Sequence, residues 1–239
     1  MYCGTFTIVA RCERTGMLGI AVASNDLAVG AHVPYLKAGA GTIATQAFFN
    51  PLIGLEGLQL LEQGAGAEET VALLVQADDG RDFRQFLVVD RLGQAAAHTG
   101  AECIDWAGHL VRPGFAVAGT MLHSDETLRA MAATFTANSR YDLPERLLLA
   151  LEWGQAAGGD RRGCRAAALC VVDREDYRYL DLRVDDHADP TRELRRLFEQ
   201  ARQQGLLDQP DGRPTRDNPI GNLTMLQQRA KLLRRGVGV

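Results

Sequence analysis

TFTIVARCERTGMLGIAVA, residues 5–23, predicts two β-strands joined by a tight turn. Residues 5–11 and 18–23 are rich in β-branched and other apolar side chains, and residues 13–16 between them have the polar, glycine-containing composition of a hairpin turn. A hairpin pairs its strands antiparallel, whereas parallel strands need a long crossover connection. The sequence therefore predicts an antiparallel sheet that begins close to residue 1.

The rest of the chain predicts alternating groups of strands and helices around this hairpin. Further strands are expected at 41–46, 83–90, 95–99, 114–119, 165–173 and 177–184, and helices at 51–63, 68–76, 124–137, 142–158 and 190–204. The order of strands, two helices, strands, two helices and strands is typical of the α+β class. Two antiparallel sheets stacked face to face, with helices outside both, would bury every apolar face, so we expect a four-layer αββα sandwich.

Composition changes after residue 204. Residues 205–222 are rich in Pro, Gly, Asp and Asn and predict an irregular linker, and residues 223–235 predict a short basic amphipathic helix. We therefore expect a domain at 1–204 and a C-terminal extension at 205–239. The basic arm at the end of the extension favours a homo-oligomer.

Charge and composition exclude several classes of protein. Hydrophobic residues make up 46% of the 239 residues, which is enough for a large core, and the formal net charge of −4 argues against general nucleic-acid binding. The five cysteines are scattered without a CxxC pair, which indicates reduced thiols rather than a disulfide framework. Neither a signal peptide nor an apolar stretch long enough to span a membrane is visible, so we expect a soluble cytoplasmic protein that binds no membrane.

The start of the first strand offers a candidate nucleophile. If the Gly4–Thr5 bond were cut, the Thr5 hydroxyl would lie beside its own α-amine, whose pKa of about 8 lets it accept the hydroxyl proton near neutral pH. Glycine suits the position before the cut because it has no side chain to obstruct attack on its carbonyl. Two alternatives stay open: Thr5 simply begins an ordinary strand, or trimming to Cys3 exposes a thiol nucleophile instead.

Several segments resemble one bacterial protein family. They are TFTIVA, TGMLGIAVAS, LAVGAHVPYLKAGAGTIATQAFFNP, AAHTG, GDRRG and LDLRVDDHADP, in this order between Thr5 and Leu197. They are similar to domain-of-unknown-function family 1028, a family of N-terminal nucleophile (Ntn) hydrolase-like proteins. The resemblance implies the αββα sandwich and places Thr5 where related hydrolases such as proteasome β-subunits carry their nucleophile.

The proteasome-like arrangement also suggests two helpers for Thr5. An acid on the connection from helix to strand corresponds to Asp160 in GGDRRG, where it would orient the nucleophile's amine and stabilise its protonated form. A lysine some thirty residues after the nucleophile corresponds to Lys37, which would lower the hydroxyl pKa. Without these roles, GGDRRG is a helix C-cap with solvated charges and Lys37 is a surface residue.

Polar residues near strand ends are candidate substrate ligands. Ser24 and Asn25 end the second predicted strand, and His98 ends a later one. Thr45, Gln46 and Asn50 lie around the end of the third strand in Ala- and Gly-rich surroundings, where polar side chains are more easily explained by a site than by a core. The acidic run at 185–189 contains one histidine and a helix cap, Asp189, so we expect neither a metal nor another cofactor.

These observations favour an amidohydrolase. Thr5, exposed by removal of residues 1–4, would cleave a C–N amide bond of a small molecule or small peptide, with Asp160 and Lys37 tuning its amine and hydroxyl. The alternative is a non-catalytic protein that binds a small molecule on the same scaffold and keeps its N-terminus unprocessed.

Overall fold

The computed structural model describes residues 2–207, 213–224, 227, 230 and 231. The chain divides into two compact units, Met1–Arg195 and Arg196–Val239. The division falls inside helix α5 (Pro190–Gln203) and therefore earlier in the chain than the end of the predicted domain at residue 204.

The predicted hairpin forms the middle of a six-stranded antiparallel sheet. Strands β2 and β3 pair along their whole length, from Thr5 opposite Ser24 to Arg11 opposite Leu18. The order across the sheet is β11-β10-β3-β2-β9-β8. The bounds are β2 Thr5–Arg11, β3 Leu18–Ser24, β8 Gly108–Arg112, β9 Phe115–Thr120, β10 Ala166–Val172 and β11 Leu180–Val184.

A second antiparallel sheet contains five strands. Strands β1, β5, β6 and β7 pair in this order, and β4 also pairs with β5. Strand β1 lies opposite Ala47 and Phe48, whereas β4 lies opposite residues 41–44 at the other end of β5. The bounds are β1 Tyr2–Cys3, β4 Pro34–Lys37, β5 Gly41–Phe48, β6 Arg84–Asp90 and β7 Ala95–Thr99.

The two sheets stack face to face around a shared apolar core. Val9 and Val22 from the six-stranded sheet belong to the same buried cluster as Leu87 and Val89 from the five-stranded sheet. Strand residues two apart share a face. Thr5 and Thr7 lie on the same face of β2 as Val9, so their side chains also face the interior between the sheets.

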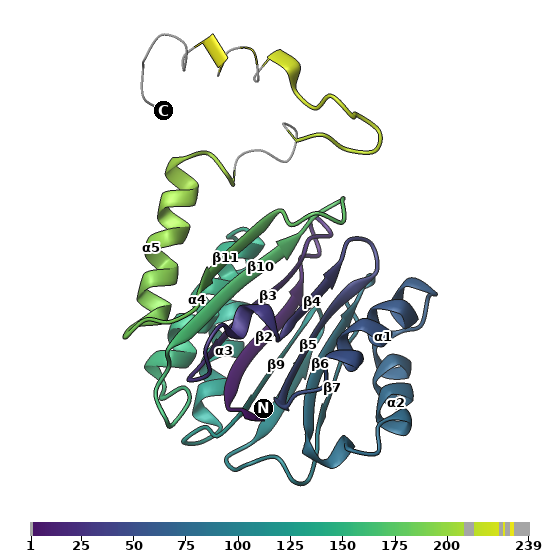
Figure 1. Ribbon diagram of the computed structural model, residues 1–239, viewed down its shortest axis with the longest axis vertical. Helices are drawn as coiled ribbons and strands as arrows, with labels where there is room; N and C mark the ends of the chain where they lie inside the picture. The colour runs from purple at the N-terminus through teal and green to yellow at the C-terminus, as the bar shows by residue number, and fades with distance from the viewer. Residues whose placement is uncertain (1, 208–212, 225–226, 228–229, 232–239) are drawn as a thin grey trace. The chain divides into compact units, whose positions relative to one another are not determined.

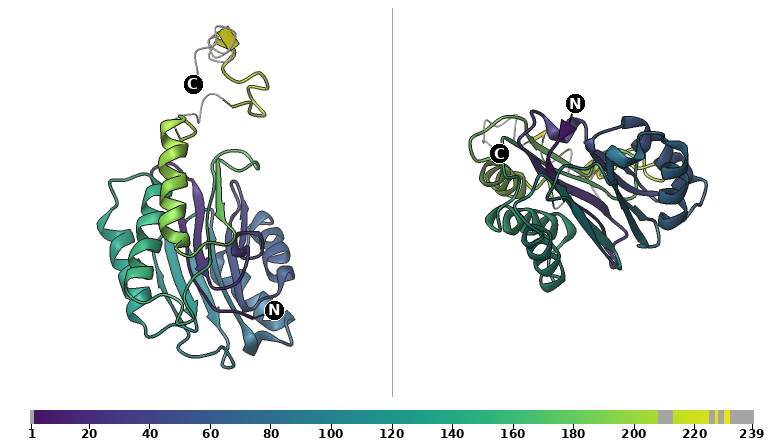
Figure 2. Two further views of the ribbon diagram at one scale, coloured as in Figure 1. Left: turned by 60° about the vertical axis from the view of Figure 1, so that its left-hand side comes forward. Right: turned by 90° about the horizontal axis from the view of Figure 1, so that it is seen from below.

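Helices cover the outer faces of both sheets, as Figures 1 and 2 show. Helices α1 (Pro51–Glu62) and α2 (Ala67–Ala77) pack on the five-stranded sheet, and α3 (Glu126–Ala137) and α4 (Leu143–Ala156) pack on the six-stranded sheet. The unit is thus a mixed α+β structure of two stacked antiparallel sheets between helical layers, as the sequence predicts.

Three strands are absent from the prediction, namely β1, β4 and β8. Strand β1 has two residues and β4 has four, so neither carries enough alternation to be recognised. Strand β8, GHLVR, lies beside β9 at the edge of its sheet and has no fully buried residue, so its sequence carries a weak strand pattern.

The second unit is described only in part. It contains the end of α5 and separate stretches after residue 212. Most of the predicted basic helix at 223–235 lies outside the described residues. Within the described part of the chain, no helix has the length and apolar character needed to cross a lipid bilayer.

Candidate functional site

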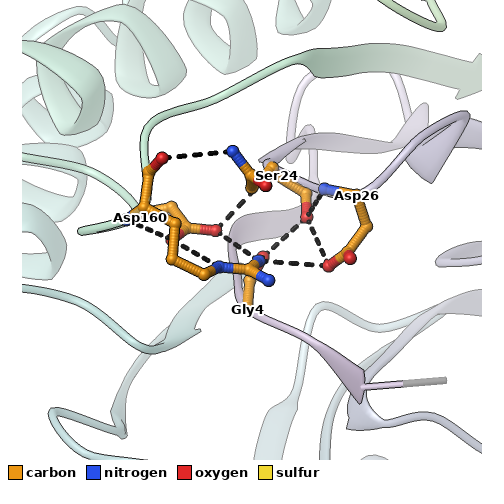
Figure 3. Close-up of polar contacts among 6 residues, drawn as sticks. Gly4, Ser24, Asp26 and Asp160 are labelled. Atoms are coloured by element: carbon orange, nitrogen blue, oxygen red, sulfur yellow. Dashed lines mark hydrogen bonds and ion pairs between the residues drawn. The ribbon is translucent and has the colours of Figure 1, made fainter.

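The carbonyl of Gly4 lies at the centre of a compact group of polar side chains. Gly4 is the single residue between β1 and β2. Its carbonyl oxygen accepts a hydrogen bond from Ser24 Oγ at 2.6 Å and a second one from Arg162 Nη2 at 3.0 Å (Figure 3). Two donors on one carbonyl oxygen are the arrangement that stabilises the oxyanion formed when a nucleophile attacks that carbonyl.

Thr5 follows this carbonyl directly and is fully buried. Its register partners are Ser24 on β3 and Thr120 on β9, so three hydroxyl residues stand in a row across the six-stranded sheet. Thr7, two residues further along β2, reaches across to Gln46 in the other sheet. Thr5 therefore faces the same interior, at the end of β2 where β1 arrives.

Arg162 is held on the Gly4 carbonyl by two carboxylates. Asp160 accepts from Arg162 Nη2 at 2.7 Å and from Nε at 3.1 Å, and Asp26 accepts from Nη2 at 3.1 Å. These contacts raise the pKa of the Arg162 guanidinium, above all the hydrogen bond to Asp160. The guanidinium therefore keeps its positive charge next to the carbonyl oxygen.

The protein fixes Asp160 tightly. Asp160 is 2% exposed. Its carboxylate also accepts hydrogen bonds from the backbone N–H of Arg162 at 2.9 Å and from that of Asn25 at 3.2 Å. The preceding residue, Gly159, has a φ of +57°, a left-handed conformation that glycine adopts without strain. This turn after α4 directs the carboxylate toward the start of β2.

Ser24 is oriented by its own neighbour along the chain. The backbone N–H of Asp26 donates to Ser24 Oγ at 3.0 Å. A serine hydroxyl carries one proton, and two acceptors lie within reach of it: the Gly4 oxygen at 2.6 Å and Asp26 Oδ2 at 3.2 Å. The much shorter contact favours Gly4, while the Asp26 N–H occupies an acceptor position on Oγ. The hydroxyl is thereby set as a donor to Gly4.

The backbone around Gly4 is crowded and unusual. A Cβ added to Gly4 would lie 2.7 Å from Arg162 Nη2 and 2.8 Å from Met121 Sδ, so no other side chain fits without displacement. Met121 has a φ of +57°, and Ala47, opposite Cys3, has a φ of +66°. Non-glycine residues in this region are strained, and such residues cluster at functional sites.

The structure brings three of the predicted residues together with Thr5. Ser24 and Asp160 contact Gly4 or its partner Arg162, and Asn25 donates from its backbone to Asp160 and from its side chain to the Arg162 carbonyl oxygen. Asp160 holds the Arg162 guanidinium, and its expected role toward the Thr5 amine stays a prediction.

Lys37 does not join this group. Its Nζ pairs with Glu62 at 2.6 Å, and its strand partner is Gly41. Gly41 and Ala47 lie at opposite ends of β5, about 20 Å apart at a rise of about 3.3 Å per residue. The expected effect of Lys37 on the Thr5 hydroxyl is therefore not supported by its position.

The other predicted substrate ligands have structural partners. Gln46 is buried between the sheets and joins Thr7 to Gln85, whose amide donates to Thr99 and to the Gly119 carbonyl oxygen. Thr45 Oγ1 donates to the Asn50 carbonyl, and the Asn50 side chain caps α1. His98 Nε2 lies 2.8 Å from the Arg81 carbonyl oxygen. These contacts give Thr45, Gln46, Asn50 and His98 structural partners, and their expected role as substrate ligands stays a prediction.

Cys164, next to Asp160, is a poor nucleophile. Burial, reinforced by the neighbouring Asp160 carboxylate, raises the pKa of Cys164 to about 12. The backbone of Cys3 pairs with Ala47, while its side chain lies outside the described residues. In the described part of the chain, no three His, Cys, Asp or Glu side chains are grouped as metal ligands would be.

Two residues of the group are missed by sequence reasoning, Arg162 and Asp26. The segment GDRRG is a visible signal, but nothing in it distinguishes Arg161 from Arg162. Asp26 follows Ser24 and Asn25 directly, so the run of polar residues after β3 is the signal that could have identified it.

An apolar hollow lies beside the end of β5. It measures about 450 Å³ and is lined by Phe48, Phe83, Arg84, Glu102 and Ile104. Three of these are exposed large hydrophobic residues, Phe48, Phe83 and Ile104. Because Phe48 is also the partner of Tyr2 in β1, the hollow adjoins the strand that leads to Gly4.

The comparisons with known proteins agree with the fold. The sequence model of DUF1028, described as a family of unknown function, matches residues 5–194. The crystal structure of protein SPO2555 from Silicibacter pomeroyi, which is assigned to the same family, is 32% identical and superimposes with a TM-score of 0.83. The alignment covers 91% of this chain and 98% of that one. No curated protein matches the chain significantly.

Proposed function

The chain belongs to DUF1028, a family of unknown function, and we propose that it is an N-terminal nucleophile amidohydrolase whose nucleophile is Thr5. One observation carries this proposal: the carbonyl immediately before Thr5 is bound by the Ser24 hydroxyl and the Arg162 guanidinium. A structural strand start has no need for two such donors, one of them charged. The family match begins at the same threonine.

The first step is cleavage of the Gly4–Thr5 bond by the chain itself. The Thr5 hydroxyl adds to the Gly4 carbonyl carbon, and Ser24 and Arg162 stabilise the negative oxygen. The C–N bond then breaks as the Thr5 nitrogen gains a proton, which leaves Gly4 as an ester on Thr5 Oγ. Water hydrolyses this ester, releasing an acid that ends in glycine and freeing the Thr5 amine.

Turnover uses the group that this step creates. The free α-amine, with an ordinary pKa of about 8, accepts the proton of the Thr5 hydroxyl as that hydroxyl attacks a substrate amide. The amine of the substrate leaves with a proton, and water again releases the acyl group. Asp160 and Asp26 keep Arg162 charged and in place, and Ser24 donates to the substrate oxygen as it does to Gly4.

Intact-mass spectrometry of the purified chain tests the proposal. We expect a mass that corresponds to a chain beginning at Thr5. The Thr5→Ala chain should keep its N-terminal segment, and Thr5→Ser, which retains a hydroxyl, should lose it. Thr15→Ala, in an exposed turn, is the matched control and should be processed normally.

The donors to the carbonyl oxygen provide a second measurement. Ser24→Ala should slow cleavage by about 10²- to 10³-fold, the usual effect of losing one such donor. A wild-type chain that remains whole under all conditions and hydrolyses no amide would contradict the proposal. It would leave a protein that binds small molecules without catalysis.

A further inference from the structure

Residues 2–4 occupy the place that the acyl part of a substrate would need. Strand β1 adds to the edge of β5, with Tyr2 opposite Phe48 and Cys3 opposite Ala47, and it delivers the Gly4 carbonyl to Ser24 and Arg162. Cleavage at Gly4–Thr5 would vacate this edge. An unpaired strand edge binds extended peptides through the same main-chain hydrogen bonds.

The surroundings of Gly4 limit which residue of a substrate can bind in its place after cleavage. The Cβ of any other residue there would lie 2.7 Å from Arg162 Nη2 and would meet Met121 at both Sδ, 2.8 Å, and Cβ, 3.0 Å. Met121 cannot easily move its Cβ, because hydrogen bonds hold its backbone on both sides. Its N–H donates to the Ile104 carbonyl oxygen, and its own carbonyl oxygen accepts from the Arg161 N–H. A larger residue next to the attacked carbonyl would therefore displace Met121 and Arg162 Nη2, the donor to that carbonyl, whereas glycine fits without displacement.

The position opposite Phe48 has different surroundings. Side chains of directly paired residues point to the same face of a sheet. A substrate residue opposite Phe48, third from the bond that is cut, would therefore extend beside the hollow of about 450 Å³, whose lining includes Phe48, Phe83 and Ile104 besides Arg84 and Glu102. An apolar or aromatic side chain would bury exposed apolar surface there.

We propose that the substrates are amides of extended acyl chains that end in glycine, bound along the β5 edge vacated by residues 2–4, with an apolar residue opposite Phe48. This inference rests on the proposed function and names the substrate class of the same site. The Thr5 hydroxyl adds to the glycyl carbonyl, its proton passes through the Thr5 amine to the leaving amine, and water then hydrolyses the ester on Thr5.

The test compares fluorogenic tripeptide amides on the chain that begins at Thr5. Acetyl-Phe-Ser-Gly, acetyl-Phe-Ser-Ala and acetyl-Asp-Ser-Gly are each coupled to aminomethylcoumarin. We expect kcat/KM for the glycine compound to exceed that for the alanine compound at least 100-fold. Replacing Phe by Asp should raise KM with little effect on kcat, because the hollow would bind this side chain equally in the ground state and the transition state.

A variant of Met121 tests whether this residue causes the preference for glycine over alanine. Met121→Gly removes both Sδ and Cβ from the wall and suits the left-handed backbone, so the preference for glycine over alanine should fall about tenfold. The remaining preference would come from the contact with Arg162 Nη2, which this variant leaves in place. Met121→Leu keeps the bulk and the backbone strain and should retain the preference. Thermal unfolding and acylation of Thr5 by a small active ester verify that each variant is folded and reactive.

The outcomes separate the two proposals. Hydrolysis without preference for glycine, or acylation of Thr5 by the active ester with no hydrolysis of any tripeptide, overturns the substrate class and leaves the nucleophile intact. A chain that neither cleaves at Gly4–Thr5 nor is acylated at Thr5 overturns the proposed function and the substrate class with it.

Discussion

Asp160 and Arg162 form two hydrogen bonds side by side, from Nη2 to Oδ2 over 2.7 Å and from Nε to Oδ1 over 3.1 Å. This bidentate pairing fixes the plane of the guanidinium as well as its position. The same Nη2 donates to the Gly4 carbonyl. A buried acid therefore sets the orientation of the donor on the carbonyl that Thr5 would attack.

Asp160→Asn should slow cleavage at Gly4–Thr5 by about 100-fold, because a small misplacement of an oriented group has an effect of this size. It should also lower the free energy of unfolding by about 1–3 kcal/mol, since Asp160 is buried and bound to one charged partner, the Arg162 guanidinium. Intact mass against time and urea unfolding measure the two effects. Asp186→Asn is the matched control, because Asp186 also binds an arginine, Arg165, but at the surface; it should change stability by less than about 0.5 kcal/mol. Equal effects from both variants would contradict the role of Asp160.

Cys3→Ala should cleave at the same bond and at the same rate as the unchanged chain. The reason is that the carbonyl with two donors belongs to Gly4, directly before Thr5, and not to Tyr2 before Cys3. N-terminal sequencing identifies the new first residue. A Cys3→Ala chain that loses amide hydrolysis while Thr5→Ala retains it would make Cys3 the nucleophile.

Gln85→Leu should destabilise the protein by about 2–4 kcal/mol. Gln85 is fully buried, accepts from Gln46 and donates to Thr99 and Gly119, so its loss leaves polar groups without partners between the two sheets. Gln59→Leu, on the exposed side of α1, is the control and should have little effect. Denaturant unfolding of both variants gives the comparison, and similar midpoints would show that this polar chain contributes nothing.

Stability should fall as the pH rises from about 9 toward 12. Burial, with the nearby Asp181 carboxylate, raises the pKa of Cys170 from 9.0 to about 12. In this interval the unfolded chain loses the thiol proton and the folded chain keeps it. Cys170 alone should therefore lower the free energy of unfolding by about 1 kcal/mol per pH unit. Urea unfolding at a series of pH values measures the slope. In Cys170→Ala the slope should be smaller, and an unchanged slope would exclude this thiol as the cause.

Much of the fold could be predicted from the sequence, because alternation in β2 and β3 and the helix boundaries are local properties. Ser24, Asn25 and Asp160 could be identified because they end a strand or follow a helix, where loops meet. Gln46 could not be placed, since only the register of β5 decides that its side chain lies between the sheets. Arg162 could not be separated from Arg161, because the turn at Gly159 and Gly163, both with positive φ, determines the direction of each side chain.

The donors to the Gly4 carbonyl come from positions 20 and 158 residues further along the chain. Under the proposed mechanism, a nascent or misfolded polypeptide lacks this arrangement and would keep an inert amino terminus. Maturation would then act as a checkpoint that only molecules with both sheets assembled can pass. In a mixed preparation, the ratio of shortened to full-length mass would count the molecules that had reached the native state.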